Sequence, residues 1–482
     1  MLKTTLSRKE FLKLTSVATA GAVAGACAPA ATAIPAAAVE ASAATTVPAS
    51  TTVPAATAVP AATAVPAATA AVATEPQEVS IFFWDGPPLI GIREEALKPF
   101  DEAYPGCQMN FTSAPGGAAG GYNDKLFTML AAGAAPDAFI IEYTELANLL
   151  SKKQLLDLRP MIEADGYDLG QFPEQMIKAY THEGGIYGLP DNLAALALFC
   201  NQDMFAEAGA TLPTAKWDDA GWTVDDFYNS CEKLTQTDAS GKATHWGYDV
   251  TTWDKVWQTW VRLFGGQLVD DPFFPTECTL NQKEAVEGLQ FLFDLRWKHG
   301  FAPKPEAMAD MGSSELLASG KLGMLNNGSW AFPNYHDVDF KVGLGHYPKG
   351  PGGRANYVYY YPIVIPKTTK NPQCAFNLLK YFNGPAMEKI IKDGGLQGTS
   401  FDAQDKWFVT DTRQPTNKEV MTDSVKHFLA PDPILTNWSE INNIMQAQID
   451  LLSIGEQRDA KVVCDEIVRQ VNPMILKGQW RS

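Results

Sequence analysis

The chain has 482 residues, of which 46% are hydrophobic and 19% charged, and its formal net charge is −17. A chain this long and this apolar is expected to form two packed units rather than one compact core or a disordered polymer. The acidity argues against a nucleic-acid binder, because neutralising phosphates requires clustered Lys and Arg.

The N-terminal segment has the composition of an export signal. Residues 1–13 are basic and polar, and the apolar run Leu14 to Ala26 is too short and too rich in Ala and Gly to span a bilayer. Ser7 to Lys13 resembles the twin-arginine export motif with Lys9 in place of the second arginine, so both this route and general secretion stay open. Ala24-Gly25-Ala26-Cys27 resembles a lipobox, in which Cys27 is acylated after cleavage. The alternative is simple secretion with an incidental cysteine.

A spacer of low complexity follows the signal. From residue 27 to residue 76 the chain is nearly all Ala, Pro, Thr, Val and Ser, and frequent Pro favours an extended tether over a helix or a core. The signal, residues 1–26, carries +3 and the tether carries −2, which leaves −18 for the rest. The acidity therefore belongs to the globular part of the chain.

Strands and helices alternate at the start of the globular part. The pattern predicts a buried strand at 78–84, a turn at 85–88, helices at 92–103 and 122–132, and a short buried strand at 138–141. This alternation favours an α/β fold with mostly parallel sheets flanked by helices.

Later helices have recognisable starts. Thr223 with Asp226, Asn281 with Glu284, and Asn371-Pro372 each precede a periodic apolar face. On these faces Cys231 and Cys374 are expected to be small buried hydrophobes rather than nucleophiles. The six cysteines after Cys27 allow fifteen pairings, and the sequence does not choose among them.

Motifs for catalysis and metal binding are absent from the sequence. The six histidines are scattered, no CxxC pair occurs, and no GxSxG, HExxH, Walker or Rossmann motif is found. We therefore expect no enzyme activity, no cofactor and no metal. Carboxylates are plentiful, but nothing in the sequence singles out a glycosidase pair.

Aromatic residues give a stronger signal, in three clusters. The clusters are Trp253/Trp257/Trp260, Trp330/Phe332 and Tyr357/Tyr359/Tyr360/Tyr361. Flat rings suit the apolar face of a sugar, and neighbouring Asp, Asn and Glu suit its hydroxyls. The competing interpretation is that these rings are ordinary core.

Several segments in order resemble the family 1 extracellular solute-binding proteins of bacterial ABC importers, the sugar-binding, maltose-binding-protein-like group. These are residues 122–158, with a Gly-x-x-Pro-Asp turn, 185–209, with Tyr-Gly-Leu-Pro, 320–330, ending in Gly-x-Trp, and 361–382. The resemblance spans nearly all of residues 78 to 400.

The resemblance implies a two-lobed, type II periplasmic-binding-protein-like fold whose lobes close over a ligand by hinge motion. Lobe 1 is expected to comprise residues 77–193 and 362–402, and lobe 2 residues 194–361 and 403–482. The ligand contacts that it implies are Trp84, Asp85, Glu142, Tyr143, Asp191, Asn192, Trp253, Trp330, Tyr359 and Gln397. Trp330 is the first choice to stack on a sugar ring.

The expected function is that of an extracytoplasmic, lipid-anchored binding protein, which captures a mono- or oligosaccharide and delivers it to the permease of an ABC importer. It is expected to be a monomer and to bind no nucleic acid. One alternative keeps the fold and changes the solute to a peptide, a polyamine or a glycerol-phosphate-like compound, with Lys255 and Arg354 as nearby cations. The other is a surface glycoside hydrolase.

Overall fold

The computed structural model describes residues 75–86, 89–114, 121–272, 274–309, 311–427 and 432–479. The predicted signal, Cys27, nearly all of the tether and Pro87-Pro88 of the predicted turn lie outside these residues. The described residues belong to one compact unit, Val72–Ser482. In this described part of the chain, no helix is both long and apolar enough to cross a membrane.

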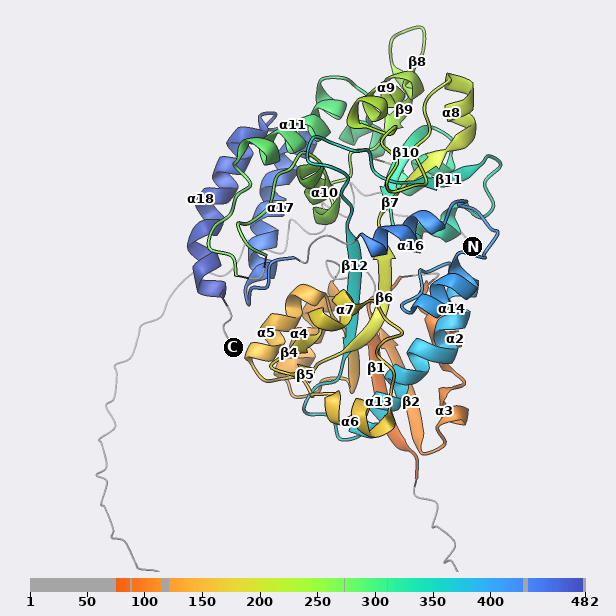
Figure 1. Cartoon of the computed structure of the whole chain (residues 1–482), viewed down its shortest axis with the longest axis vertical. Helices are drawn as coiled ribbons and strands as arrows, with labels where there is room; N and C mark the ends of the chain where they lie inside the picture. Colours follow the sequence, from red (N-terminus) through yellow and green to blue (C-terminus); the bar gives the residue numbers. More distant parts are fainter. Residues whose placement is uncertain are drawn as a thin grey trace, which may run out of the picture. The chain divides into compact units, whose positions relative to one another are not determined.

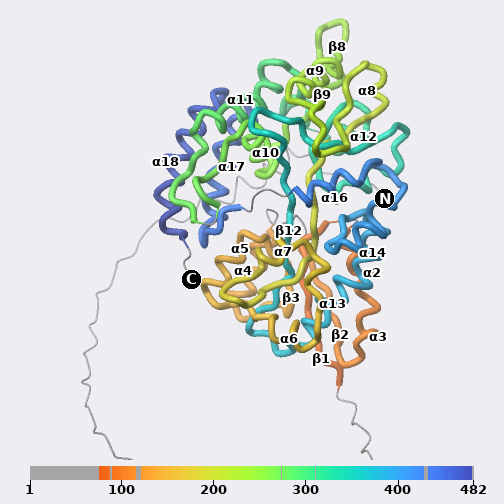
Figure 2. The backbone as a smooth tube through the Cα atoms, viewed as in Figure 1, coloured from red at the N-terminus to blue at the C-terminus, as the bar shows by residue number. Residues whose placement is uncertain are grey.

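The first sheet has the strand order β2-β1-β3-β12-β6 (Figures 1 and 2). Its strands are β1 (Gln77–Phe83), β2 (Cys107–Ser113), β3 (Ala138–Ile140), β6 (Leu189–Ala195) and β12 (Val358–Val364). The helices of the same chain segments are α2 (Leu89–Leu97), α3 (Phe100–Ala103), α4 (Asn123–Ala131), α5 (Tyr143–Ser151), α6 (Arg159–Asp165), α7 (Glu174–Ala179), α13 (Pro372–Tyr381) and α14 (Met387–Gly394). A small hairpin pairs β4 (Thr181–His182) with β5 (Gly185–Ile186).

The second sheet has the order β11-β7-β10-β9-β8. Its strands are β7 (Ala197–Asn201), β8 (Gln236–Thr237), β9 (Ala243–Tyr248), β10 (Leu322–Asn327) and β11 (Val342–Gly345). The helices between its strands are α8 (Gln202–Ala208), α9 (Val224–Leu234), α10 (Asp254–Leu263), α11 (Lys283–Trp297), α12 (Ser313–Ala318) and η3 (Ser329–Tyr335). The chain after α14 adds α15 (Phe401–Ala403), α16 (Glu419–Lys426), α17 (Trp438–Ile454) and α18 (Ala460–Gly478), of which α15 and α16 contribute to the same hydrophobic cluster as the first sheet. α10 packs on α11, and α18 packs on both α11 and α17 (Figure 1).

Both sheets are mixed, which corrects the mostly parallel pairing expected from the sequence. In the first sheet β1 pairs in parallel with β2 and β3, whereas β12 pairs antiparallel with β3 and β6. In the second sheet β10 pairs in parallel with β9, but β7 pairs antiparallel with β10 and β11, and β8 with β9. The reason is that β6 leaves the first sheet toward the second, and β12 returns beside it in the opposite direction. Leu196 separates β6 from β7, so the chain changes sheets within one residue.

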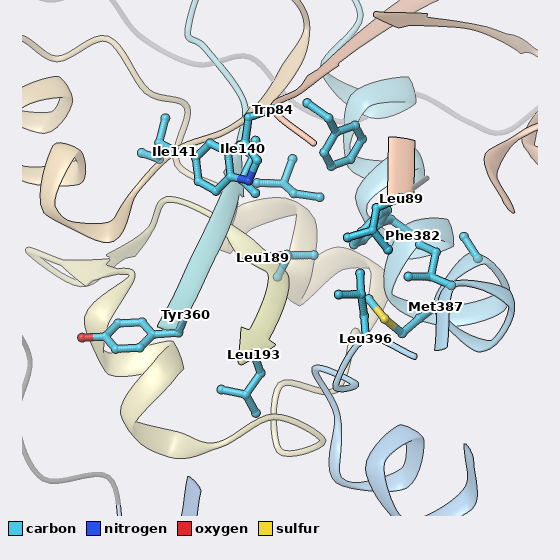
Figure 3. Packing of buried hydrophobic residues seen from close by; sticks show 14 of the residues in the cluster. Trp84, Leu89, Ile140, Ile141, Leu189, Leu193, Tyr360, Phe382, Met387 and Leu396 are labelled. Carbon is cyan, nitrogen blue, oxygen red and sulfur yellow. The ribbon is translucent and has the colours of Figure 1, made fainter. Parts of the chain in front are cut away.

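Two hydrophobic clusters form the core. Side chains alternate between the two faces of a strand, so β7 contributes to both clusters. Phe199 belongs to the first cluster, and Leu198 and Cys200 belong to the second. Figure 3 shows part of the first cluster, with Leu189 and Leu193 on β6 and with Leu89, Phe382 and Met387 to one side of that strand.

Local sequence signals match the structure to different degrees. The capping box of Thr223 and Asp226 is confirmed at the start of α9. The helix predicted at residues 92–103 is instead two helices, α2 and α3, because Pro99 has no backbone N–H to continue the first one. α11 begins at Lys283, with Gln282 rather than Asn281 in the capping position.

The cysteines divide into bonded and free. Cys107 at the start of β2 forms a disulfide with Cys374 on α13, so Cys374 is not the simple buried hydrophobe that its helical position predicted. Cys231 is a buried free thiol, as predicted. Cys278 and Cys464 are also buried and free.

Candidate functional site

Five aromatic side chains form a continuous series that leads from the first sheet to the second. Trp84 follows β1, Tyr361 and Tyr359 lie on β12, Trp330 lies in η3, and Trp253 precedes α10. Neighbouring ring centroids are 4.8 Å apart for Trp84 and Tyr361, 5.6 Å for Tyr361 and Tyr359, 5.6 Å for Tyr359 and Trp330, and 6.1 Å for Trp330 and Trp253. The structure therefore brings four of the predicted ligand contacts into one surface.

Local backbone rules explain how these rings are presented. Tyr359 and Tyr361 are two residues apart on a strand and so share a face, while Tyr360 between them packs against Tyr143 with centroids 4.9 Å apart. The ring of Trp330 lies over Gly328, where a Cβ would come within 2.1 Å of it. The Gly-x-Trp motif thus has a physical reason, since any side chain at Gly328 would displace the indole.

A small charged cavity adjoins the tyrosines. Its lining comprises Glu142, Tyr143, Thr144, Asp254, Lys255, Tyr357, Tyr359, Tyr360, Tyr361 and Asp432. The cavity has a volume of about 30 Å³, which admits water but no sugar ring.

Lys255 is the centre of an ion-pair network in this lining. Its Nζ lies 2.9 Å from Asp254 and 2.6 Å from Asp432, and 4.9 Å from the centre of the Tyr357 ring. The Tyr357 hydroxyl donates to Asp432 at 2.5 Å. Burial alone would lower the pKa of Lys255, but the two aspartates raise it above its ordinary value, so the side chain stays charged.

The carboxyl of Glu142 in the cavity lining has a strongly raised pKa. Burial raises its pKa to about 7, the carboxylate of Asp254 adds to this effect, Lys255 opposes it, and Asp432 and Glu145 raise it further. At neutral pH this side chain is therefore divided between its protonated and ionised forms. The protonated form donates a hydrogen bond and the ionised form accepts one, so the group can serve either partner.

Asp85 and Asp191 lie in a second ion-pair network, inside lobe 1. Arg93 on α2 donates to both oxygens of Asp191, at 2.6 and 3.3 Å, and also pairs with Asp85. The guanidinium lies over the rings of Phe83 and Phe382. Burial raises the pKa of Asp191 to about 6, while Arg93 lowers it. Asp85 and Asp191, both predicted ligand contacts, therefore pair with Arg93 and lie outside the cavity lining. Through Arg93 they connect the segment after Trp84 to strand β6.

Asn192 and Gln397 support the strands of the site. Asn192 lies opposite Tyr361 in the β6–β12 register. Gln397 is 1% exposed, accepts from the backbone N–H of Ala195 at 3.0 Å, and donates its own backbone N–H to Ser329 at 3.0 Å. Gln397 therefore joins the end of β6 to the residue that precedes Trp330.

Comparison with known proteins identifies the family. A model of the bacterial extracellular solute-binding protein family matches residues 86–389. The chain belongs to this family. The family expected from the sequence is thereby confirmed.

Curated relatives of this solute-binding protein are distant. The maltodextrin-binding protein MdxE of Bacillus subtilis is 25% identical over 266 residues, which cover 52% of this chain and 57% of the relative. The match thus spans little more than half of that relative's length. A maltooligosaccharide ABC transporter solute-binding lipoprotein of Streptococcus pneumoniae is 22% identical over 84% of this chain and 90% of its own.

Solved structures show the fold. An ABC substrate-binding protein from Listeria monocytogenes in complex with cycloalternan has a TM-score of 0.74 and 22% identity, covering 83% of this chain and 99% of that one. A maltose-bound protein of T. maritima has a TM-score of 0.66 and 20% identity over 82% of this chain and 99% of that one. The two-lobed, type II periplasmic-binding-protein-like fold predicted from the sequence is therefore confirmed, with mixed sheets.

Seven members of the cavity lining in this solute-binding protein are not among the predicted ligand contacts: Thr144, Asp254, Lys255, Tyr357, Tyr360, Tyr361 and Asp432. Asp254 begins α10 directly after the predicted contact Trp253, and this position next to Trp253 could have identified it from the sequence. Asp432 lies between two prolines, 177 residues from its partner Lys255, so no local pattern marks it. The sequence suggests Lys255 only as a cation for a phosphate-bearing solute, and it does not predict the ion pairs of Lys255 with Asp254 and Asp432.

Proposed function

We propose that this protein captures a carbohydrate between its lobes and delivers it to the permease of an ABC importer. The observation that carries the proposal is the aromatic series from Trp84 to Trp253, which lies beside a lining of carboxylates and tyrosine hydroxyls. Rings stack on the apolar faces of sugars, and carboxylates accept from their hydroxyls. The names of the maltodextrin-binding and maltooligosaccharide-binding relatives support the same ligand class.

A thermal-shift screen across mono- and oligosaccharides tests the proposal. At a hundredfold excess over its dissociation constant, a ligand adds about 2.7 kcal/mol to the stability of the folded state, so a cognate sugar raises the melting temperature. Trp330→Ala should reduce the shift, because it removes the ring at the middle of the aromatic series.

Trp297→Ala is the matched control. Trp297 on α11 packs against Arg458, 4.8 Å from the ring centre, and lies outside the aromatic series. Both variants lose a tryptophan, but the control should keep the full ligand-induced shift. An absence of response to every sugar, or an equal loss of response in both variants, would count against carbohydrate capture at this site.

The proposal includes a hinge motion between the lobes at the crossing strands β6 and β12. We place the moving bodies at residues 77–193 with 362–402 and at 194–361 with 403–482. In support, β6 and β12 run side by side in the first sheet, and the chain changes sheets at Leu196 and again before Val358. Small-angle scattering with and without the cognate sugar should show a smaller radius of gyration in the complex, and an unchanged radius would refute closure.

The anchor and the export route belong to the same proposal. Residues 1–26 would be the signal and 27–76 the tether, with Cys27 acylated, so the lobes would stand outside the cytoplasmic membrane. The Ala24 to Cys27 sequence and the lipoprotein relative of Streptococcus pneumoniae support this arrangement. Metabolic labelling with a fatty acid should mark the protein, and Cys27→Ala should abolish the label while leaving export intact.

Capture without turnover distinguishes this proposal from a surface glycoside hydrolase. The pKa of Glu142 is raised to about 7, as is typical of the general acid of a glycoside hydrolase. This observation favours the hydrolase as the alternative function. Members of the matched family bind solutes, and we propose that this chain does the same without cleaving them. Prolonged incubation with a bound oligosaccharide should return it intact by chromatography, and new reducing ends would favour the hydrolase.

A further inference from the structure

The cavity lining has more negative than positive groups. Glu142, Asp254 and Asp432 are acidic, and Lys255 is the one Lys or Arg in the lining as described. Lys255 already pairs with both aspartates. With all groups ionised, the lining therefore carries a net charge of −2, and Glu142 has no cation of its own there.

Asp432 has unused capacity to accept a hydrogen bond. The side chain is 2% exposed, and its Oδ2 accepts from Lys255 and from Tyr357. Its Oδ1 has no hydrogen-bond partner within the parts of the chain that the structure describes. A buried carboxylate oxygen without a partner is costly, so a ligand that donates to it gains more than it would at a solvated group.

The aromatic groups beside these carboxylates also suit a cation. The ring of Tyr357 already faces the ammonium of Lys255, 4.9 Å from its centre, and Tyr359 and Tyr361 line the same cavity. An ammonium that is removed from water is attracted to an aromatic face by the negative potential above the ring. Carboxylates and ring faces together select for positive charge more than either does alone.

We propose that the solute is a saccharide that carries a protonated amine, and that the amine lies among Glu142, Asp432 and the tyrosine rings. This inference rests on the proposed carbohydrate function and narrows its ligand class. The sugar ring would stack on the aromatic series, and the ammonium would neutralise the excess negative charge of the lining.

Other ligand charges fit the lining less well. An anionic solute would need a free cation, but Lys255 is held between Asp254 and Asp432. A neutral sugar can donate hydroxyls to the carboxylates, yet closure of the lobes over it would desolvate the acidic excess without compensating it. Burial raises the pKa of Glu142 to about 7, and the carboxylates of Asp254 and Asp432 add to this effect. The ligand-free lining therefore already disfavours a further negative charge at Glu142.

Matched sugars that differ in one substituent test the charge. Isothermal titration would compare glucose, galactose and mannose with their 2-amino and N-acetyl-2-amino derivatives. The pH would be kept below the amine pKa of about 8. The N-acetyl forms keep the nitrogen substituent but remove its charge. We expect at least one amine to bind about tenfold or more tightly than both its parent and its acetylated form, and its affinity to fall as salt is raised.

Glu142→Gln provides the variant test, because glutamine keeps the shape and removes the charge. It should lower the affinity for the amine about tenfold more than it lowers the affinity for the parent sugar, because only the amine loses a charge pair. Glu232→Gln on the exposed face of α9 is the matched control and should keep the preference. Asp432→Asn is a second variant in which the preference for the amine over the parent sugar should fall. The salt dependence of amine binding to the wild-type protein tests the same charge without a mutation.

The outcomes separate the two proposals. If neutral sugars bind as tightly as their amines, or if Glu142→Gln leaves the preference unchanged, the amine inference is refuted while carbohydrate capture stands. If no sugar of any charge binds, carbohydrate capture fails as well. Binding of spermidine without binding of any amino sugar would also refute the inference, because the ligand would then be a polyamine and not a saccharide.

Discussion

Glu142→Gln should stabilise the ligand-free protein at high pH and leave it unchanged at low pH. The pKa of Glu142 is about 7 in the folded protein against an ordinary value of 4.5. An acid whose folded pKa is raised contributes stability that is fully present below its unfolded pKa and is lost as the pH rises through its folded pKa. The wild-type protein therefore loses stability between about pH 4.5 and pH 7 on account of this group, and a glutamine does not.

The size of the effect follows from the two pKa values. Their difference corresponds to at most about 3.5 kcal/mol, at about 1.4 kcal/mol per pH unit. Solvent that reaches this partly exposed side chain reduces the expected gain to about 1–2 kcal/mol above neutral pH. Urea unfolding of both proteins at several pH values measures it, with Glu232→Gln as a control. Equal stability of Glu142→Gln and wild type at pH 8, or a gain that is as large at pH 5, would refute the reasoning.

Three further changes test the framework that holds the site. Arg93→Met should cost about 3–5 kcal/mol in urea unfolding, since it leaves the buried carboxylate of Asp191 and the partly buried one of Asp85 without their cation, and a loss below 1 kcal/mol would show that the network is not needed. Replacing Cys107 and Cys374 by serine should lower stability by about 2–5 kcal/mol, because the bond closes a loop of 267 residues, and a reductant should lower the melting temperature of wild type but not of the variant. Thr223→Ala should cost about 1 kcal/mol through loss of the capping box, whereas no change in the unfolding midpoint would mean that the cap contributes nothing.

Local rules predict the parts of this fold that depend on neighbouring residues. Thr223 and Asp226 are three residues apart, and their capping box needs only helix geometry, so the sequence shows it. The strand β1 is visible for the same reason. The break between α2 and α3 was also visible, because Pro99 lies inside the run that was assigned to one helix.

Contacts between distant residues could not be predicted in this way. Cys107 and Cys374 are 267 residues apart, and nothing local prefers their pairing among fifteen. Asp191 was expected at the ligand because its motif resembles the family's crossing segment. Its actual partner, Arg93, is 98 residues away and takes both carboxylate oxygens. A motif identifies the segment that reaches the site, but the side chain's partner depends on what packs against it.

The aromatic cluster near α10 shows how burial separates core from site. Trp253, Trp257 and Trp260 are spaced so that each could belong to one helical stripe, and from the sequence alone the core and the ligand interpretations are evenly matched. Trp257 and Trp260 are fully buried and belong to the second hydrophobic cluster, while Trp253 is 43% exposed and faces Trp330. An exposed indole against a second indole gains little stability from burial, so packing alone does not account for its position. The helix thus contributes two tryptophans to the second hydrophobic cluster, while Trp253, just before its first turn, stays partly exposed beside Trp330.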